Sequence, residues 1–203
     1  MTAELSDLKT RLRPCFDDPV CDSQAAFRAL MNAIAYPGRI ELVNRLRDAP
    51  PPLHAATATL CLTLADFETP LWIDPHLAST DVLAWLQFHC RAPIVTSPKD
   101  ARFVLADCRS QVPHLDELHP GEVEYPERSS TLILQVASLS GREGVRWTGP
   151  GINGTTTARI STLPRWFWAE WAMNSELYPL GADVIFASGE AIVGLPRSVR
   201  VEA

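Results

Sequence analysis

The segment 131–136 is the feature that most constrains the fold of this chain. It holds six consecutive residues that are mainly apolar or β-branched, and none of them is charged. A run of this kind, without alternation of polar and apolar residues, is typical of a strand that is buried on both faces. The sequence therefore predicts an α/β protein with this segment in the middle of its sheet.

Helix and strand patterns alternate along the rest of the chain. An acidic cap at Asp17 or Asp18 followed by Pro19 predicts a helix over residues 19–36. The apolar positions spaced for its buried face are Phe27, Leu30, Met31 and Ile34. Further helices are expected over 53–64, 79–90 and 165–174, and strands at 40–43, 71–73, 103–106, 183–187 and 191–193. The polar stretch 108–130 is expected to run over the surface.

Residues 145–147 and 156–160 flank a glycine-rich loop with an Asn-Gly pair, which indicates an antiparallel hairpin. The hairpin interrupts an otherwise parallel pattern, so the expected fold is a three-layer α/β/α sandwich with a mixed sheet. Composition does not change abruptly along the 203 residues, which favours a single domain over 1–203, with residues 1–15 expected to be mobile.

Composition and charge exclude several classes of protein. A formal charge of -6 is unlike a nucleic-acid-binding protein, whose affinity depends on Lys and Arg. No apolar run approaches the ~20 residues of a membrane span, and the first residues do not resemble a secretion signal, so we expect no membrane and a cytoplasmic location. The five cysteines are scattered, which predicts reduced thiols instead of disulfides or a zinc site.

The loop of the hairpin has the one recognisable binding pattern, because Gly149, Gly151 and Gly154 match G-x-G-x-x-G. A dinucleotide site needs a helix directly after this loop, whereas threonines that favour a strand follow here. A tight hairpin turn is therefore the preferred interpretation. An anion-binding loop formed by Gly149, Gly151, Asn153 and Gly154, with Arg146 or Arg197 nearby, is the alternative.

Residues for catalysis do not form a recognisable set, and we predict no catalytic residue, no metal site and no cofactor. His114 and His119 lie five residues apart in the polar stretch, which is not a helical metal-binding spacing. Lys99 is the one candidate for a pyridoxal Schiff base, but it lies in an exposed turn where nothing would lower its pKa. Carboxylates at the ends of strands or helices, where clefts form, are Asp66, Glu68, Asp74, Asp107 and Asp183.

The helix over 165–174 is unusually aromatic. Trp166, Phe167 and Trp168 are consecutive, and at ~100° per residue they cannot all face one core. Together with Trp171 they suggest an interface with a partner subunit or with a second copy of the chain, formed by Trp166, Trp168 and Trp171. A helix enclosed within the monomer is the alternative.

The order of motifs over nearly the whole chain resembles the PhnH family of the phosphonate carbon-phosphorus lyase system. Its characteristic segments are the polar-apolar entry to the first helix at 16–28, Pro37-Gly38, Asp66 to Pro70, 126–136, the loop 149–154, Trp171 with Asn174, 179–183 and 195–197. The resemblance is in the succession of these segments, since each one alone is short.

This resemblance implies a fold like the large domain of pyridoxal-phosphate-dependent transferases without the cofactor, and a homodimer when isolated. It also implies assembly with the G, I and J subunits of that system, in which ribose triphosphate from ATP is transferred to methylphosphonate with release of adenine. The chain would be a non-catalytic or accessory subunit with no activity of its own. The alternative is a nucleotide- or phosphonate-binding subunit with a cryptic transferase site.

Overall fold

A computed structural model describes residues 15–46 and 48–202 of the chain, so most of the segment expected to be mobile, residues 1–14, lies outside the described residues. The helices are α2 (Pro19–Ala35), α3 (Ala55–Leu64), α4 (Thr80–His89) and α5 (Phe167–Glu176), with short 3-10 turns η1 (Pro98–Asp100), η2 (Leu115–Glu117) and η3 (Pro126–Arg128). The strands are β1 (Glu41–Leu42), β2 (Leu71–Ile73), β3 (Phe103–Asp107), β4 (Thr131–Gln135), β5 (Leu139–Thr148), β6 (Thr156–Ile160), β7 (Asp183–Ser188), β8 (Ala191–Leu195) and β9 (Arg200–Glu202).

The main sheet has six strands in the order β1-β8-β7-β4-β3-β2. Strands β2, β3, β4 and β7 run parallel, whereas β8 and β1 are antiparallel to their neighbours, which confirms the predicted mixed sheet. Strand β4 lies between β3 and β7, and its last four residues are buried. The central position that the uncharged run predicted for this segment is therefore correct.

The predicted hairpin is also present, but it belongs to a separate sheet. Strands β5 and β6 pair antiparallel and join β9 in a three-stranded sheet with the order β6-β5-β9. Trp147 and Ala158 on the two hairpin strands are fully or almost fully buried against the main sheet. The small sheet therefore shares a hydrophobic core with the large one.

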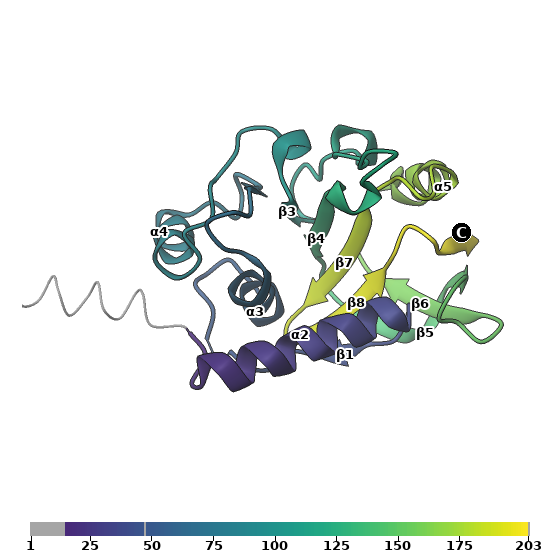
Figure 1. Cartoon of the computed structure of the whole chain (residues 1–203). Helices are drawn as coiled ribbons and strands as arrows, with labels where there is room; N and C mark the ends of the chain where they lie inside the picture. Colours follow the sequence, from purple (N-terminus) through teal and green to yellow (C-terminus); the bar gives the residue numbers. More distant parts are fainter. Residues whose placement is uncertain (1–14, 47, 203) are drawn as a thin grey trace, which may run out of the picture.

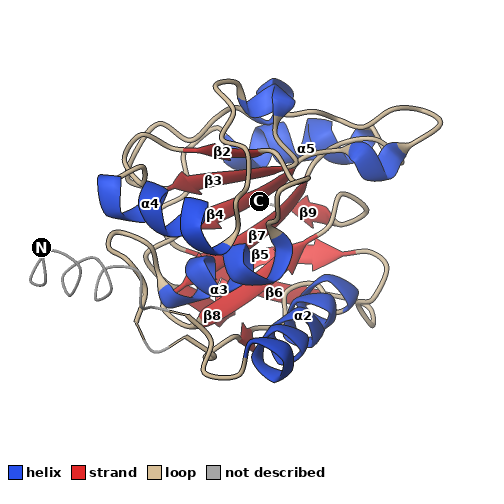
Figure 2. Ribbon diagram, turned by 60° about the vertical axis from the view of Figure 1, so that its left-hand side comes forward, coloured by secondary structure: helices blue, strands red, loops and turns tan. Residues whose placement is uncertain are grey.

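Two different layers cover the main sheet (Figures 1 and 2). Helices α2, α3 and α4 lie on one face, where Leu105, Ile133 and Ile185 join their core. Helix α5, turn η2 and the three-stranded sheet cover the other face, where Val104, Leu132 and others form a second core. The expectation of helices on both faces is thus correct, but the second layer is part helix and part sheet.

Helix α2 begins where the sequence predicted, since the Asp18 side chain accepts hydrogen bonds from the backbone of Val20 and Cys21. Its predicted buried stripe is wrong in part. Ala26, Leu30 and Ala33 are buried, whereas Phe27 and Met31 are each 48% exposed. The helix packs too closely on β8 for large side chains, because a Cβ at Gly194 would lie 2.5 Å from the Ala33 carbonyl oxygen.

The polar stretch 108–130 was expected to run over the surface, but part of it is buried. It contains η2 and η3, and Val112, Leu115 and Leu118 insert from it into the second core. Charged residues between these three apolar positions hide the pattern, because a 3-10 turn and irregular backbone impose no fixed period. The segment thereby becomes part of the layer that contains α5.

Candidate functional site

Three buried polar side chains meet at the carboxyl ends of adjacent parallel strands. Asp74 follows β2, Asp107 ends β3 and Gln135 ends β4, and each is at most 2% exposed. The carboxyl edge of a parallel sheet is where α/β proteins place functional groups. Two of these residues were among the carboxylates that the sequence placed at strand ends, whereas Gln135 was treated only as part of a strand.

Asp107 is held by the residue two positions later. Its carboxylate accepts hydrogen bonds from Arg109 Nε at 2.9 Å and Nη2 at 2.7 Å, and from Gln135 Nε2 at 3.1 Å. Burial alone would raise the pKa of Asp107, but hydrogen bonds from Arg109 and Gln135 and the charge of Arg109 lower it to about 2. The Asp107 carboxylate is therefore ionised at neutral pH.

Asp74 and Gln135 extend this network to neighbouring segments. Asp74 accepts hydrogen bonds from the backbone of His76 and Asp107 and from the Ser110 hydroxyl. Gln135 Oε1 accepts from the His54 backbone at 2.7 Å, at the start of α3. The network thus ties the first turn of α3 to the ends of three strands.

Ser110 connects the network to an open cleft of ≈ 610 Å³ on the side of α5. Trp72 of β2 and Trp166, just before α5, lie in its walls, as do Gln111 and His114. The His114 ring stacks on Trp166 with centroids 4.4 Å apart, and its Nδ1 lies 2.5 Å from Glu170 Oε1. The hydrogen bond to Glu170 raises the pKa of His114 above its usual range.

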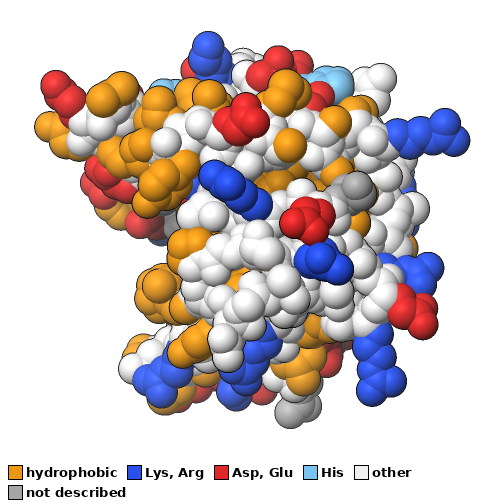
Figure 3. Space-filling view, turned by 90° about the vertical axis from the view of Figure 1, so that its right-hand side faces the viewer, with side chains coloured by type: hydrophobic (Ala, Val, Ile, Leu, Met, Phe, Trp, Pro, Cys, Tyr) orange, Lys and Arg blue, Asp and Glu red, His pale blue; other side chains and the backbone are white. Residues whose placement is uncertain are grey.

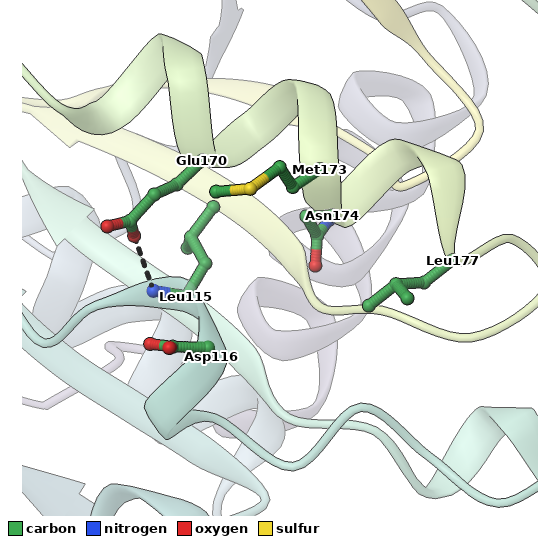
Figure 4. Close-up of a pocket in the computed structure, with 6 residues that line it drawn as sticks. All are labelled: Leu115, Asp116, Glu170, Met173, Asn174 and Leu177. Atoms are coloured by element: carbon green, nitrogen blue, oxygen red, sulfur yellow. Dashed lines mark hydrogen bonds between the residues drawn. The ribbon is translucent and has the colours of Figure 1, made fainter.

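A second, smaller cavity of ≈ 210 Å³ lies between η2 and α5. Figure 4 shows Met173 extending toward Leu115, with Leu177 farther along the helix and Asp116 below them. Glu170 fixes the two elements together, because its Oε2 accepts a hydrogen bond from the Leu115 backbone at 3.0 Å. We call this cavity the η2–α5 notch.

Comparison with known proteins places the chain in a family. The model of the bacterial phosphonate metabolism protein (PhnH) family matches residues 14–202. The chain belongs to the PhnH family.

Two curated relatives agree with this PhnH assignment. The alpha-D-ribose 1-methylphosphonate 5-triphosphate synthase subunit PhnH of Rhizobium meliloti (strain 1021) is 35% identical over 187 residues, which are 92% of this chain and 94% of that protein. The putative C-P lyase subunit protein HtxG of Stutzerimonas stutzeri is 32% identical over 178 residues, which are 88% of this chain and 85% of that protein. The resemblance noted from the order of motifs is therefore confirmed.

In this PhnH-family chain the predicted anion-binding loop is a tightly packed turn between β5 and β6. A Cβ at Gly151 would lie 2.0 Å from the Ala35 carbonyl oxygen, so the loop rests on the end of α2. A strand follows it, as predicted, and not a helix. Gly149 and Gly154 have positive φ and Asn153 is exposed, and phosphate binding by these four residues stays a prediction.

The two arginines proposed to assist that loop have other partners. Arg197 donates to both carboxylate oxygens of Asp183, to the Pro126 carbonyl and to Ser129, which places it at the start of β7. Arg146 forms an exposed ion pair with Glu202 at 3.5 Å. Arg197 is therefore engaged in binding chain segments together and is only 12% exposed.

The three tryptophans of the predicted interface differ in burial. Trp171 is fully buried and its Nε1 donates to the Val199 carbonyl at 3.0 Å, so its placement on an exposed surface is wrong. Trp166 and Trp168 are partly exposed, and Trp168 packs edge-on against Trp147. The exposed face of α5 instead presents Met173, which the sequence reasoning missed although Met173 and Leu177 lie one helical turn apart.

Groups suited to covalent or metal chemistry are placed unfavourably. Lys99 is exposed in η1, as predicted. Burial raises the pKa of the Cys90 thiol to about 11 and that of Cys61 well above its usual range, so both are protonated at neutral pH. Within residues 15–46 and 48–202 no three His, Cys, Asp or Glu side chains are grouped so that they could hold a metal ion, and no helix there is long and apolar enough to cross a membrane.

Proposed function

We propose that this chain is an accessory subunit of the carbon-phosphorus lyase system in organic phosphonate catabolism. It would support the transfer of ribose triphosphate from ATP to an alkylphosphonate. The observation that supports this most strongly is the 35% identity, over nearly the full length of both chains, to a protein named as a subunit of the ribose 1-methylphosphonate 5-triphosphate synthase. The second relative is also named as a subunit.

The chemistry of the polar network supports an accessory role. Asp107 is bonded to Arg109 and Gln135, and Asp74 to Ser110 and two backbone amides. Groups that satisfy one another in this way fix chain segments in place but leave few lone pairs or protons for a substrate. In this proposal the reacting groups of the transferase belong to other subunits.

The proposed partners are the G, I and J subunits, with a homodimer as the state of the isolated chain and the cytoplasm as its location. We further propose that residues 1–203 act as one domain whose architecture follows the large domain of pyridoxal-phosphate-dependent transferases. The shared core beneath the two sheets supports a single unit. Lys99 lies in an exposed turn outside the polar network, which fits such an architecture without the cofactor.

Reconstitution tests this function directly. The G, I and J subunits are purified with and without this chain, and release of adenine from ATP in the presence of methylphosphonate is measured by chromatography. We expect little activity from the three subunits, full activity after addition of this chain, and none from the chain alone. Full activity without the chain, or turnover by the chain alone, would contradict the proposal.

The ≈ 610 Å³ cleft favours one alternative, a subunit that binds nucleotide or phosphonate itself. Its size is in the range of small-molecule sites, and Trp72 and Trp166 line it. Calorimetric titration of the isolated chain with ATP and with methylphosphonate separates the two functions. Saturable binding lost in Trp166→Ala would favour a cleft site, and loss in Asn153→Ala would favour the hairpin loop.

A further inference from the structure

The η2–α5 notch is a mainly apolar recess, smaller and more enclosed than the ≈ 610 Å³ cleft. Leu115 and Asn174 form its floor at 6% and 5% exposure, and Met173 and Leu177 form its rim at 60% and 52%. Its volume of ≈ 210 Å³ is several times the ~30 Å³ of a water molecule, so it has room for a side chain. An exposed apolar ridge beside an unfilled recess is a common feature of protein interfaces.

The floor of the notch offers little to a polar ligand. The Asn174 amide is already used, since its Nδ2 donates to the Ala182 carbonyl and its Oδ1 accepts from the Ala182 backbone. Glu170 is likewise bonded to His114 and to the Leu115 backbone. The group that fits best is therefore an aliphatic or aromatic side chain, which loses no hydrogen bonds when it enters.

Charge around the notch indicates the character of the partner. Helix α5 and turn η2 together contain four acidic residues and no Lys or Arg, namely Asp116, Glu117, Glu170 and Glu176. Figure 3 views the molecule from the side on which α5 lies in Figure 1, and apolar and acidic side chains gather in the upper part of this face, with Lys or Arg side chains above and below them. Across a two-fold axis these acids would face their own copies, which is unfavourable. A basic partner would be attracted instead.

We propose that the η2–α5 notch is a docking site for another subunit of the complex, which inserts one large apolar side chain flanked by Lys or Arg. This inference rests on the proposed function, since it assigns the place at which the accessory subunit is held. Met173 and Leu177 provide the apolar contact, and Asp116 and Glu176 provide the charge that selects the partner. The partly exposed Trp166 and Trp168 precede the same helix and would lie at the margin of the contact.

Co-purification of the full chain with tagged, co-expressed G, I and J subunits tests the site. Met173→Glu and Leu177→Glu place a charge at the rim and should reduce the recovered chain at least about tenfold, as expected for an interface hot spot. Met31→Glu is the matched control, because Met31 is also half exposed but lies on α2. It should leave recovery unchanged. Equal recovery of all three variants would overturn the docking site.

Charge reversal tests whether the partner carries Lys or Arg beside its apolar side chain. Asp116→Lys with Glu176→Lys should weaken co-purification and reduce its dependence on salt, because attraction to a basic partner is screened by ions. Circular dichroism of each isolated variant verifies that the chain is folded. Unchanged recovery and unchanged salt dependence would contradict a basic partner.

Two results separate this inference from the proposed function. If the unaltered chain does not co-purify with the G, I and J subunits, both fail together. If it co-purifies and Met173→Glu does not weaken it, only the docking site fails. Sedimentation of the isolated chain gives the remaining outcome: Met173→Glu converting a dimer to a monomer, with the complex intact, would show a second copy in the notch and overturn the proposal.

Discussion

Arg109→Met removes the guanidinium group that forms an ion pair with the buried Asp107 carboxylate. The methionine side chain keeps an apolar stem of similar length. Asp107 is 1% exposed, and a fall in its pKa from 3.8 to about 2 corresponds to about 2.5 kcal/mol of folding free energy. Arg109 itself is 55% exposed, so water partly replaces its contribution. We expect Arg109→Met to lower the free energy of unfolding by about 2 kcal/mol at pH 7.

The pH dependence has a definite sign. The folded pKa of Asp107 lies below its unfolded value, so the stabilisation is fully present above about pH 4 and is lost as pH falls toward 2. Arg109→Met should therefore differ from the unaltered chain by less at pH 2.5 than at pH 7. Urea unfolding at the two pH values, at fixed protein concentration, measures this difference.

Two further variants make the test decisive. Arg146→Met breaks an exposed ion pair with Glu202 and should change stability by less than about 0.5 kcal/mol. In the double-mutant cycle of Arg109→Met with Asp107→Asn, the coupling energy should exceed about 1 kcal/mol. The melting temperature of Arg109→Met should fall by about 4–8 °C for a chain of this size. A coupling energy near zero at pH 7 would refute the reasoning that this pair organises the strand ends.

Two other predictions concern the hairpin loop and the histidine in the cleft. Gly151→Ala should destabilise the chain by more than about 2 kcal/mol, because φ is +81° and the new Cβ would lie 2.0 Å from the Ala35 carbonyl oxygen. Gly154→Ala has a similar φ of +76° but no atom within 4 Å, so thermal melting should show a loss of only about 1 kcal/mol. Glu170→Gln should return the pKa of His114 toward its usual value of 6.5, followed by NMR titration of the imidazole. Because the pKa of His114 is raised in the folded state, the His114–Glu170 pair stabilises the fold below pH 6.5, and this stabilisation is lost as the pH rises through the folded pKa. If the His114 titration is the same in Glu170→Gln as in the unaltered chain, the ion pair is excluded.

The sequence predicted the features that follow from local pattern. The uncharged run before Val136 identified the central strand, Asp18 with Pro19 identified the start of α2, and the Asn-Gly pair identified the hairpin turn. Each of these depends on residues close together in the chain. Tertiary packing decided what local pattern could not. The close approach of α2 to Gly194 on β8 buries the face of the helix that carries small side chains. The larger apolar residues Phe27 and Met31 are left half exposed.

The candidate site was predictable only in its carboxylates. Asp74 and Asp107 were recognised at strand ends, but Arg109 and Ser110 lie in the polar stretch, where no period indicates which side chains turn inward. Gln135 has the pattern of a strand residue, and only the parallel register with Asp107 on β3 shows that its amide faces a carboxylate. Partners separated by 28 residues leave no signature in a single sequence.

The buried network and the proposed docking notch belong to one continuous segment. This segment, residues 107–117, begins at the end of β3 and ends in η2. At its start, Arg109 and Gln135 donate hydrogen bonds to the Asp107 carboxylate. At its end, the Leu115 backbone donates a hydrogen bond to Glu170 of α5. The carboxylates of Asp107 and Glu170 thus fix the two ends of this segment, although most of its length lacks regular structure. Ordering an irregular segment costs about 1–2 kcal/mol per residue in backbone entropy, so strong anchors are needed to hold it. The ionised Asp107 buried beneath the segment serves as such an anchor, and the docking surface that we propose at η2 depends on the segment being held in this way.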